Sequence, residues 1–187
     1  MRNLNIILMI CVCILVHSCK ENKISTMVES MTGQTFKFNE ADCLILHKGD
    51  TAMLNNTLQE DYEYVFYYDS TQCTSCALNN IDGVSEFKEY IIQEHLPVRL
   101  TFVFAPSTAN MNLFQDIYMQ SVFDEPVFVD KDYTIESQNM FVPKEHMFHS
   151  FLIDKFGKIL LVGSPLRNSE LRELMKQIIV DSRSFDK

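Results

Sequence analysis

The stretch from Tyr62 to Ala77, YEYVFYYDSTQCTSCA, constrains the fold of this chain more than any other. Apolar and aromatic residues run almost without interruption from Tyr62 to Tyr68, a pattern typical of a strand buried on both faces of a parallel sheet. A polar turn follows, and Cys73 and Cys76 stand where a helical pattern begins. The sequence therefore predicts a strand that delivers two cysteines to the start of a helix.

This cysteine pair points to thiol chemistry. Only the thiolate is nucleophilic, and the unpaired N–H groups at a helix N-terminus stabilise it. With two residues between them, Cys73 can attack a partner sulfur and Cys76 can resolve the mixed disulfide. Thr74 and Ser75 add hydroxyl and N–H groups but no positive charge. A static disulfide that staples the start of the helix is the alternative.

The N-terminus has the pattern of an export signal. Arg2 is followed by an apolar run from Ile6 to Val16, which is shorter than the roughly 20 residues that span a bilayer. The run ends in LVHSC, which resembles the lipobox where a bacterial lipoprotein is cleaved and its cysteine lipidated. We expect a signal peptide over 1–18, a flexible tether over 19–32 that begins at the lipid-bearing Cys19, and a domain over 33–187. Ordinary secretion and an uncleaved anchor are the alternatives.

The net charge and the number of cysteines limit the possible binding partners and the possible roles of the thiols. The formal net charge of −9 makes binding to nucleic acid or anionic lipid unfavourable, so membrane attachment would depend on acyl chains. Of the six cysteines, Cys11 and Cys13 would leave with the signal. Cys43 would then remain unpaired beside the dithiol, as a small core hydrophobe or, in the sharper alternative, as a third redox or metal partner.

The remaining periodicity predicts an α/β fold with a central mixed sheet. The expected strands are Gly33–Phe38, Cys43–His47, Tyr62–Tyr68, Val98–Phe104, Pro126–Asp130, Phe148–Asp154 and Lys158–Gly163, of which the last two form a hairpin. The expected helices are Thr74–His95, Asn110–Val122, a short one within Lys131–Met140, and Ser169–Val180. Methionines 111, 119 and 175 are expected on the core faces of their helices.

Three stretches together resemble the thioredoxin superfamily: YVFYYDSTQCTSCAL around the dithiol, PVFVDKDY, and SFLIDKFGKILLVGSP in the expected hairpin. More specifically, they are similar to exported TlpA/ResA-type thiol-disulfide reductases. The resemblance implies a thioredoxin-like fold, here with an N-terminal strand extension, central sheet and flanking helices. It also implies reversible exchange, with Cys73 as the attacking thiol and Cys76 as the resolving thiol.

Four positions depart from the pattern of these reductases. Gln72 replaces a usual Trp, and Asn79 and Tyr67 replace two acids that accept protons in relatives. Phe148 stands where the family carries a cis-proline, so we expect a trans peptide there and a differently shaped groove. Proton transfer from Cys76 would then depend on Glu63, Asp69 or water.

His149 is the histidine most relevant to the site, because its loop should face the dithiol. We expect it to be exposed or to contact substrate in a groove formed with Thr74, Ser75 and Phe148. Alternatively, Cys73, Cys76 and His149 could hold Cu(I) or Zn(II), which would make the chain a non-enzymatic binding module. His47, His95 and His146 show no ligand-like spacing.

The sequence thus predicts a lipid-anchored reductase of the cell envelope. Its partners would be protein thiols or disulfides and, through the lipid, the membrane. No resident cofactor or metal and no nucleic acid are expected.

Overall fold

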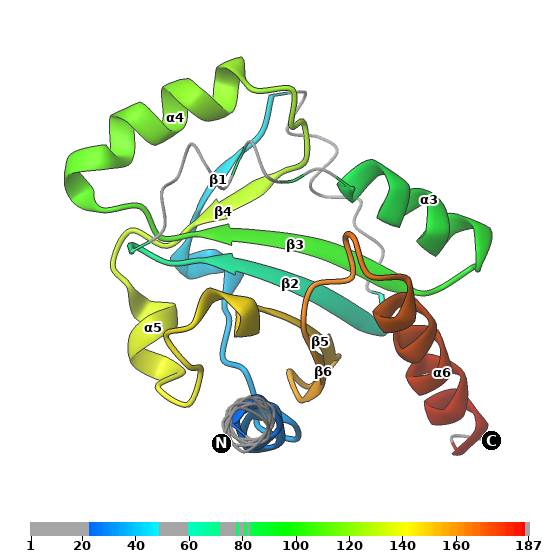
Figure 1. Cartoon of the computed structure of the whole chain (residues 1–187). Helices are drawn as coiled ribbons and strands as arrows, with labels where there is room; N and C mark the ends of the chain where they lie inside the picture. The colour runs from blue at the N-terminus through cyan, green and yellow to red at the C-terminus, as the bar shows by residue number, and fades with distance from the viewer. Residues whose placement is uncertain (1–22, 49–59, 72–77, 79–80, 82, 186–187) are drawn as a thin grey trace, which may run out of the picture.

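The computed structural model describes residues 23–48, 60–71, 78, 81 and 83–185 of the chain and contains one six-stranded sheet. The strand order is β1-β4-β3-β2-β5-β6 (Figure 1). The strands are β1 (Leu44–Leu46), β2 (Tyr62–Tyr68), β3 (Val98–Phe104), β4 (Val127–Val129), β5 (Ser150–Asp154) and β6 (Ile159–Val162). Strands β2, β3 and β4 pair in parallel, whereas β1, β5 and β6 each run antiparallel to their neighbour, so the sheet is mixed as expected.

Helices cover both faces of this sheet (Figure 1). The α-helices are α3 (Val84–Gln93), α4 (Met111–Gln120), α5 (Thr134–Gln138) and α6 (Ser169–Phe185), and the short 3-10 turns are η1 (Glu40–Asp42), η3 (Thr108–Asn110) and η4 (His146–Phe148). One core cluster joins α3, α4 and α6 to the sheet, and the other lies beneath α5 and a helix over residues 23–31. None of the helices in the described part is both long and apolar enough to cross a membrane.

Strand β2 occupies the middle of the sheet and is buried on both faces, as its lack of alternation predicts. Tyr64 and Phe66 belong to the first core cluster, whereas Val65 and Tyr67 belong to the second. The ring of Phe66 stacks on that of Phe102 in β3, with centroids 5.0 Å apart. The strand that leads to the dithiol is therefore held by side-chain packing on both sides.

The C-terminal hairpin and helix also match the prediction. Strands β5 and β6 pair antiparallel, and the Asp154 carboxylate accepts hydrogen bonds from the backbone N–H groups of Phe156 (2.8 Å) and Lys158 (3.0 Å) in the turn. Helix α6 is capped by Asn168, whose side chain accepts from the N–H of Leu171 at 3.0 Å.

The helix expected over Thr74–His95 differs from the prediction, because α3 begins only at Val84. Gly83 immediately precedes it with a left-handed backbone (φ 95°), and Ile81 is not helical. A Cβ atom at position 83 would lie 2.6 Å from the carbonyl oxygen of Leu166. Gly83 therefore precedes the start of α3, instead of lying inside a continuous helix.

The segment 19–32 was expected to be a flexible tether, but its described residues are ordered against the domain. Residues 23–31 form a helix, and Met31 is fully buried in the second core cluster. Ile24, Met27 and Val28 pack against the same cluster. The prediction was wrong for this segment because apolar residues at one-turn spacing stand among polar ones, and a sheet face is available to them.

The expected N-terminal strands are observed in part. Leu44–Leu46 forms β1, but over Gly33–Phe38 only Thr35 makes a bridge, to Lys158 beyond the hairpin turn. Phe36 is nevertheless buried and packs edge-on against Phe151 at 4.7 Å. Backbone hydrogen bonds also join the segment to the start of β6, from the N–H of Gly33 to the Ile159 carbonyl (2.8 Å) and from the N–H of Ile159 to the Gln34 carbonyl (2.9 Å).

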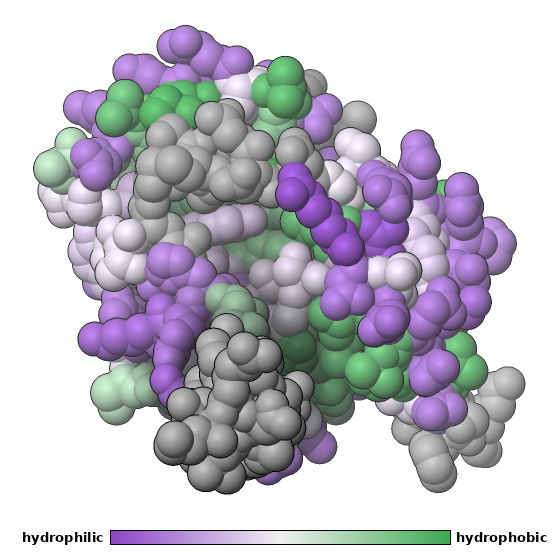
Figure 2. Space-filling model, viewed as in Figure 1, coloured by the Kyte–Doolittle hydropathy of each residue, from purple (hydrophilic) through white to green (hydrophobic). Residues whose placement is uncertain are grey.

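Met119 departs from its expected position in the core. Its side chain is 57% exposed, as is that of Leu113, whereas Phe114 and Tyr118 of the same helix are fully buried. Figure 2 shows hydrophobic residues gathered on the surface over α4, at the top of the view. Met119 follows Tyr118 directly, so the helical repeat turns it away from the buried stripe. Met175 is fully buried and Met111 packs against the core, as predicted.

Candidate functional site

The dithiol and its neighbours fall mostly outside the described residues. The predicted functional residues that lie outside the described part are Cys19, Cys73, Thr74, Ser75 and Cys76. Phe148 and His149 are described, together with the end of β2 that leads to the dithiol. The setting of the predicted site can therefore be built from the residues around it.

The chain leaves β2 through a hydrogen-bonded turn. The Asp69 Oδ1 atom accepts from the backbone N–H of Thr71 at 3.0 Å and from its hydroxyl at 2.7 Å. The Thr71 Oγ1 atom also lies 3.0 Å from Nε2 of His146, across a sequence distance of 75 residues. Since the hydroxyl hydrogen is directed to Asp69, His146 is the donor in this contact. The turn before the dithiol is thus joined to the loop before β5.

His149 is buried, so of its two expected settings, exposure or a contact with substrate in the groove, the first is wrong. Its relative exposure is 3%, and its Nε2 atom lies 2.7 Å from the carbonyl oxygen of Pro143. A carbonyl can only accept, so Nε2 carries the proton and, in the neutral ring, Nδ1 carries the lone pair. The Nδ1 atom lies 3.8 Å from Oδ2 of Asp69, which is longer than a hydrogen bond. The 3-10 turn η4, which directly precedes His149, places the ring inside the loop.

The surroundings of His149 favour the neutral imidazole. Burial lowers the pKa of His149, and the hydrogen bond to Pro143 and the charge of Asp69 partly oppose this shift. The ring centroid lies 5.4 Å from that of Tyr67 and 5.6 Å from that of His146. The site therefore combines a neutral, buried proton acceptor with a nearby carboxylate that would stabilise its protonated form.

Phe148 is a core residue and not a groove contact. It is 2% exposed and belongs to the second core cluster, because η4 turns its side chain inward. The described peptide bonds, including the one before Phe148, are all trans, which confirms the expected trans geometry there.

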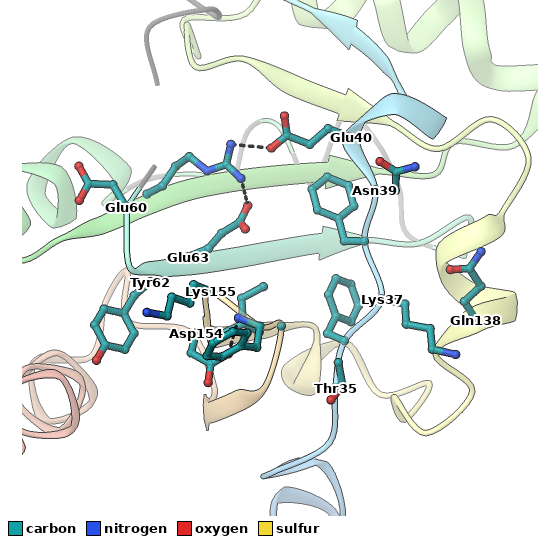
Figure 3. Close-up of a pocket in the computed structure, with 16 residues that line it drawn as sticks. Thr35, Lys37, Asn39, Glu40, Glu60, Tyr62, Glu63, Gln138, Asp154 and Lys155 are labelled. Carbon is teal, nitrogen blue, oxygen red and sulfur yellow. Dashed lines mark hydrogen bonds and ion pairs between the residues drawn. The ribbon is translucent and has the colours of Figure 1, made fainter. Parts of the chain in front are cut away.

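Glu63 lies at the far end of β2 from this site. Its Oε1 atom accepts from Nη2 of Arg99 at 2.8 Å and from the Thr101 hydroxyl, and Nη1 of Arg99 reaches Glu40 at 2.6 Å (Figure 3). Burial raises the pKa of Glu63, and Arg99 opposes the shift. Six residues of strand separate Glu63 from Asp69, or about 20 Å. Of the two candidate proton acceptors, only Asp69 lies at the end of β2 that leads to the dithiol.

Glu63 instead contributes to a cleft of about 740 Å³. Figure 3 shows the extended segment from Thr35 to Glu40 along one side and the hairpin residues Asp154 and Lys155 nearby. Carboxylates and basic groups are mixed along its walls, and its charged Arg99 is already held by two acids. No described feature of this cleft selects a particular ligand.

Cys43 behaves as the small hydrophobe that the sequence predicts. It is a free thiol, half-buried, and it packs against the second core cluster. Burial, followed by the charges of Asp130, Asp42 and Glu40, raises the pKa of its thiol to about 12. The thiol stays protonated at neutral pH and is therefore a poor nucleophile.

Of the three proposed metal ligands Cys73, Cys76 and His149, only His149 is described, and its Nε2 atom is engaged by the Pro143 carbonyl. Within the described residues, no three His, Cys, Asp or Glu side chains are grouped as a metal would need.

The sequence analysis did not place His146 and Thr71 in the group of side chains around Asp69. The available signal was the spacing of His146 and His149, because residues three apart around a helical turn lie on the same side. Both imidazoles face the Asp69 carboxylate, with Nε2 of His146 3.8 Å from Oδ1. The observed group is Asp69, Thr71, His146 and His149.

The pH dependence of stability should report on His149. Its folded-state pKa is below the ordinary value near 6.5, so stability is fully present above about pH 6.5 and is lost as the pH falls towards the lowered value. Replacement by Gln removes this dependence. Urea unfolding between about pH 7.5 and 5 should therefore show a smaller loss of unfolding free energy in His149→Gln than in the wild type.

The exposed His95 provides the matched control for this measurement. His95→Asn retains a residue that tolerates the positive φ of 51° at this position. We expect its pH profile to follow that of the wild type. A His149→Gln profile that also follows the wild type would contradict the burial of a neutral imidazole.

Comparison with known proteins gives matches only among solved structures. No family model matches the chain, and no curated protein matches it. A candidate thiol:disulfide interchange protein DsbE from Chlorobium tepidum matches with 17% identity and a TM-score of 0.46, over 80% of this chain and 96% of that one. The thioredoxin domain of a thiol-disulfide oxidoreductase from Bacteroides vulgatus matches with 13% identity and a TM-score of 0.44, over 79% and 97% of the two chains.

A third match is the pneumococcal exposed lipoprotein thioredoxin Etrx1 of Streptococcus pneumoniae. It has 15% identity and a TM-score of 0.43, over 64% of this chain and 85% of that one. Sequence identities and TM-scores as low as these are no basis for assigning a function to this chain. The assignment of the fold therefore depends on the order and direction of the strands.

That order is specific. A central strand β2 pairs in parallel with β3 after a crossover that includes α3, and on its other side pairs antiparallel with the hairpin β5–β6, which α6 follows. This β-α-β and β-β-α arrangement is the one that the sequence resemblance implied, and the additional strands β4 and β1 extend the sheet beyond β3. The chain is an α/β protein with the thioredoxin-like fold.

Proposed function

We propose that the chain is a thiol-disulfide oxidoreductase that reduces disulfides of partner proteins through Cys73 and Cys76. The observation that carries the proposal is the group Asp69, Thr71, His146 and His149, which surrounds the point where the chain leaves β2 towards the dithiol. Consecutive Cα atoms are about 3.8 Å apart, so the Cα atom of Cys73 can lie at most about 7.6 Å from that of Thr71. Chain connectivity alone thus limits the distance between the nucleophile and this group.

The exchange would proceed in two steps. The Cys73 thiolate attacks one sulfur of the partner disulfide, forming a mixed disulfide and releasing the other partner sulfur as a thiolate, which takes up a proton. Cys76 then loses its proton and attacks the Cys73 sulfur, which releases the second partner cysteine as a thiolate. The chain ends with a Cys73–Cys76 disulfide and the partner with two thiols.

His149, supported by Asp69, is the proposed acceptor of the Cys76 proton. Its Nε2–H is fixed on Pro143, so a proton is taken up at Nδ1, on the side of the Asp69 carboxylate. A neutral imidazole with a carboxylate nearby is suited to accept a proton at neutral pH. Thr74 and Ser75 would contribute hydroxyl and N–H groups to the attacking thiolate.

A reduction potential tests the proposal directly. The reduced and oxidised proteins are equilibrated in glutathione buffers, alkylated, and analysed by mass spectrometry. We expect one two-electron transition at Cys73 and Cys76, with a midpoint between about −270 and −120 mV. Cys43 provides an internal reference, since it should remain a thiol at every potential. A midpoint below about −300 mV would indicate a structural disulfide and would overturn the proposal.

The cellular setting is part of the proposal. The lipobox-like LVHSC places a lipid on Cys19, and export to the cell envelope brings the chain to a compartment where disulfides form. Membrane fractionation tests this point: Cys19→Ala should move the protein from the membrane to the soluble fraction, and an unchanged distribution would exclude the lipid anchor.

A further inference from the structure

A second, smaller cavity adjoins the candidate site. Its volume is about 210 Å³, and it lies between the end of β2, helix α5 and the loop that follows it. Asp69 and His149 line it, so it shares a wall with the candidate site. A cavity of about 150 Å³ is enough to hold benzene. This one has room for a single side chain, but it is smaller than ordinary pockets for large ligands.

Tyr67 is the residue of this cavity that most clearly lacks a partner. It is 95% buried, since its relative exposure is 5%, and it forms part of the cavity wall. Its hydroxyl is the only buried side-chain polar atom in the described part of the chain without a hydrogen-bond partner. Leaving such a group unpaired is unfavourable, and buried polar groups usually have a protein, water or ligand partner. The hydroxyl is therefore available to a group that enters the cavity.

The charges that act on this hydroxyl are negative. After burial, the carboxylates of Glu136, Asp69 and Asp130 raise the pKa of Tyr67. Asp130 is already engaged at the start of α5, where it accepts from Thr134 and Ile135. Asp69 and Glu136 line the cavity itself. The field at the hydroxyl thus favours a positively charged guest.

Much of the remaining wall suits an aliphatic chain. Five apolar residues contribute to it, Phe36, Ile135, Met140, Val142 and Pro143, whereas Asn139, His149 and the exposed Lys144 are its polar members. A guest with a flexible hydrocarbon stem and a cationic head would cover the apolar residues with its stem and bring its head to the acidic end. Lysine and arginine side chains have this combination.

We propose that this cavity binds a basic side chain, lysine or arginine, of the partner polypeptide beside its disulfide. That the side chain belongs to a partner polypeptide rests on the proposed function. The binding of an alkyl cation in the cavity does not depend on that function. The Tyr67 hydroxyl would accept a hydrogen bond from the ammonium or guanidinium group, and Asp69 and Glu136 would neutralise its charge.

The binding test uses the purified mature protein in its reduced form and n-butylammonium as the probe, followed by amide shifts in two-dimensional NMR. We expect saturable shifts at residues around the cavity, no comparable binding of the neutral n-butanol, and about tenfold weaker binding in Tyr67→Phe. Tyr90→Phe is the matched control, because it also loses a hydroxyl, at a hydrogen bond between α3 and α6. Equal binding of amine and alcohol, or unchanged affinity in Tyr67→Phe, would overturn the proposal.

A second measurement distinguishes a substrate side chain from a free amine. Two disulfide peptides that differ only in lysine against norleucine beside one cysteine are compared by kcat/KM. We expect about a tenfold preference for lysine that disappears in Tyr67→Phe. Amine binding without a peptide preference would overturn the assignment to a substrate side chain. Absence of turnover with both peptides would count against the proposed function, and the binding test would still decide the chemistry of the cavity.

Discussion

Replacement of Cys73 by serine is expected to reduce insulin-disulfide reduction to the rate of the reductant alone. A serine hydroxyl does not attack disulfides, and Cys76 is proposed to resolve the mixed disulfide and not to form it. Cys43, which lies in the described part of the chain, is half-buried and has a pKa raised to about 12, so its thiol is almost entirely protonated at neutral pH. The measurement is the turbidity of reduced insulin with dithiothreitol as the electron source.

Cys43→Ser is the control for this result. It also removes one thiol, but one whose raised pKa makes it a poor nucleophile and which packs against the second core cluster. We expect its rate to remain close to that of the wild type. Equal rates for Cys73→Ser and the wild type would show that the dithiol does not carry the reduction.

Replacement of Gly83 by alanine is expected to lower the free energy of unfolding by about 3 kcal/mol or more. The backbone at this position is left-handed, with φ at 95°, which is unfavourable for residues with a Cβ atom. The new Cβ atom would also lie 2.6 Å from the Leu166 carbonyl oxygen, a backbone atom that cannot rotate away. The contact joins the start of α3 to the segment before α6. Urea unfolding followed by circular dichroism measures the loss.

The variant Gly33→Ala separates the effect of the left-handed backbone from the effect of a close contact of the new Cβ atom. Gly33 has a similar left-handed backbone, with φ at 85°, but a Cβ atom there would meet only the end of the Lys158 side chain, 4.0 Å away. We therefore expect a smaller loss of about 1–2 kcal/mol, from the backbone conformation alone. Similar losses for the two variants would show that the close approach to Leu166 has no energetic weight.

Local patterns predicted the elements that position the site. The uninterrupted apolar run of β2 indicated burial on both faces, and Tyr64 and Val65 indeed belong to opposite core clusters. The turn at Lys155–Gly157 marked the hairpin, and the apolar stripe of α6 marked the last helix. These features depend on neighbours in the sequence, so the sequence contains the information needed to recognise them.

Contacts between distant segments could not be predicted in the same way. The interruption before α3 depends on Leu166, more than 80 residues from Gly83, and the packing of Ile24, Met27, Val28 and Met31 depends on a sheet face formed by later strands. The pairing of Thr71 with His146 is equally remote. Periodicity describes one segment at a time, so the composition of the site and the burial of His149 required the structure.

A trapped mixed disulfide tests the central claim most directly. In Cys76→Ser the resolving thiol is absent, so the bond between Cys73 and a partner cysteine should accumulate and be visible by non-reducing electrophoresis and mass spectrometry. We expect a covalent adduct at Cys73 that a reductant cleaves and that is absent in the double variant Cys73→Ser/Cys76→Ser. No adduct, or an adduct at Cys43, would contradict it.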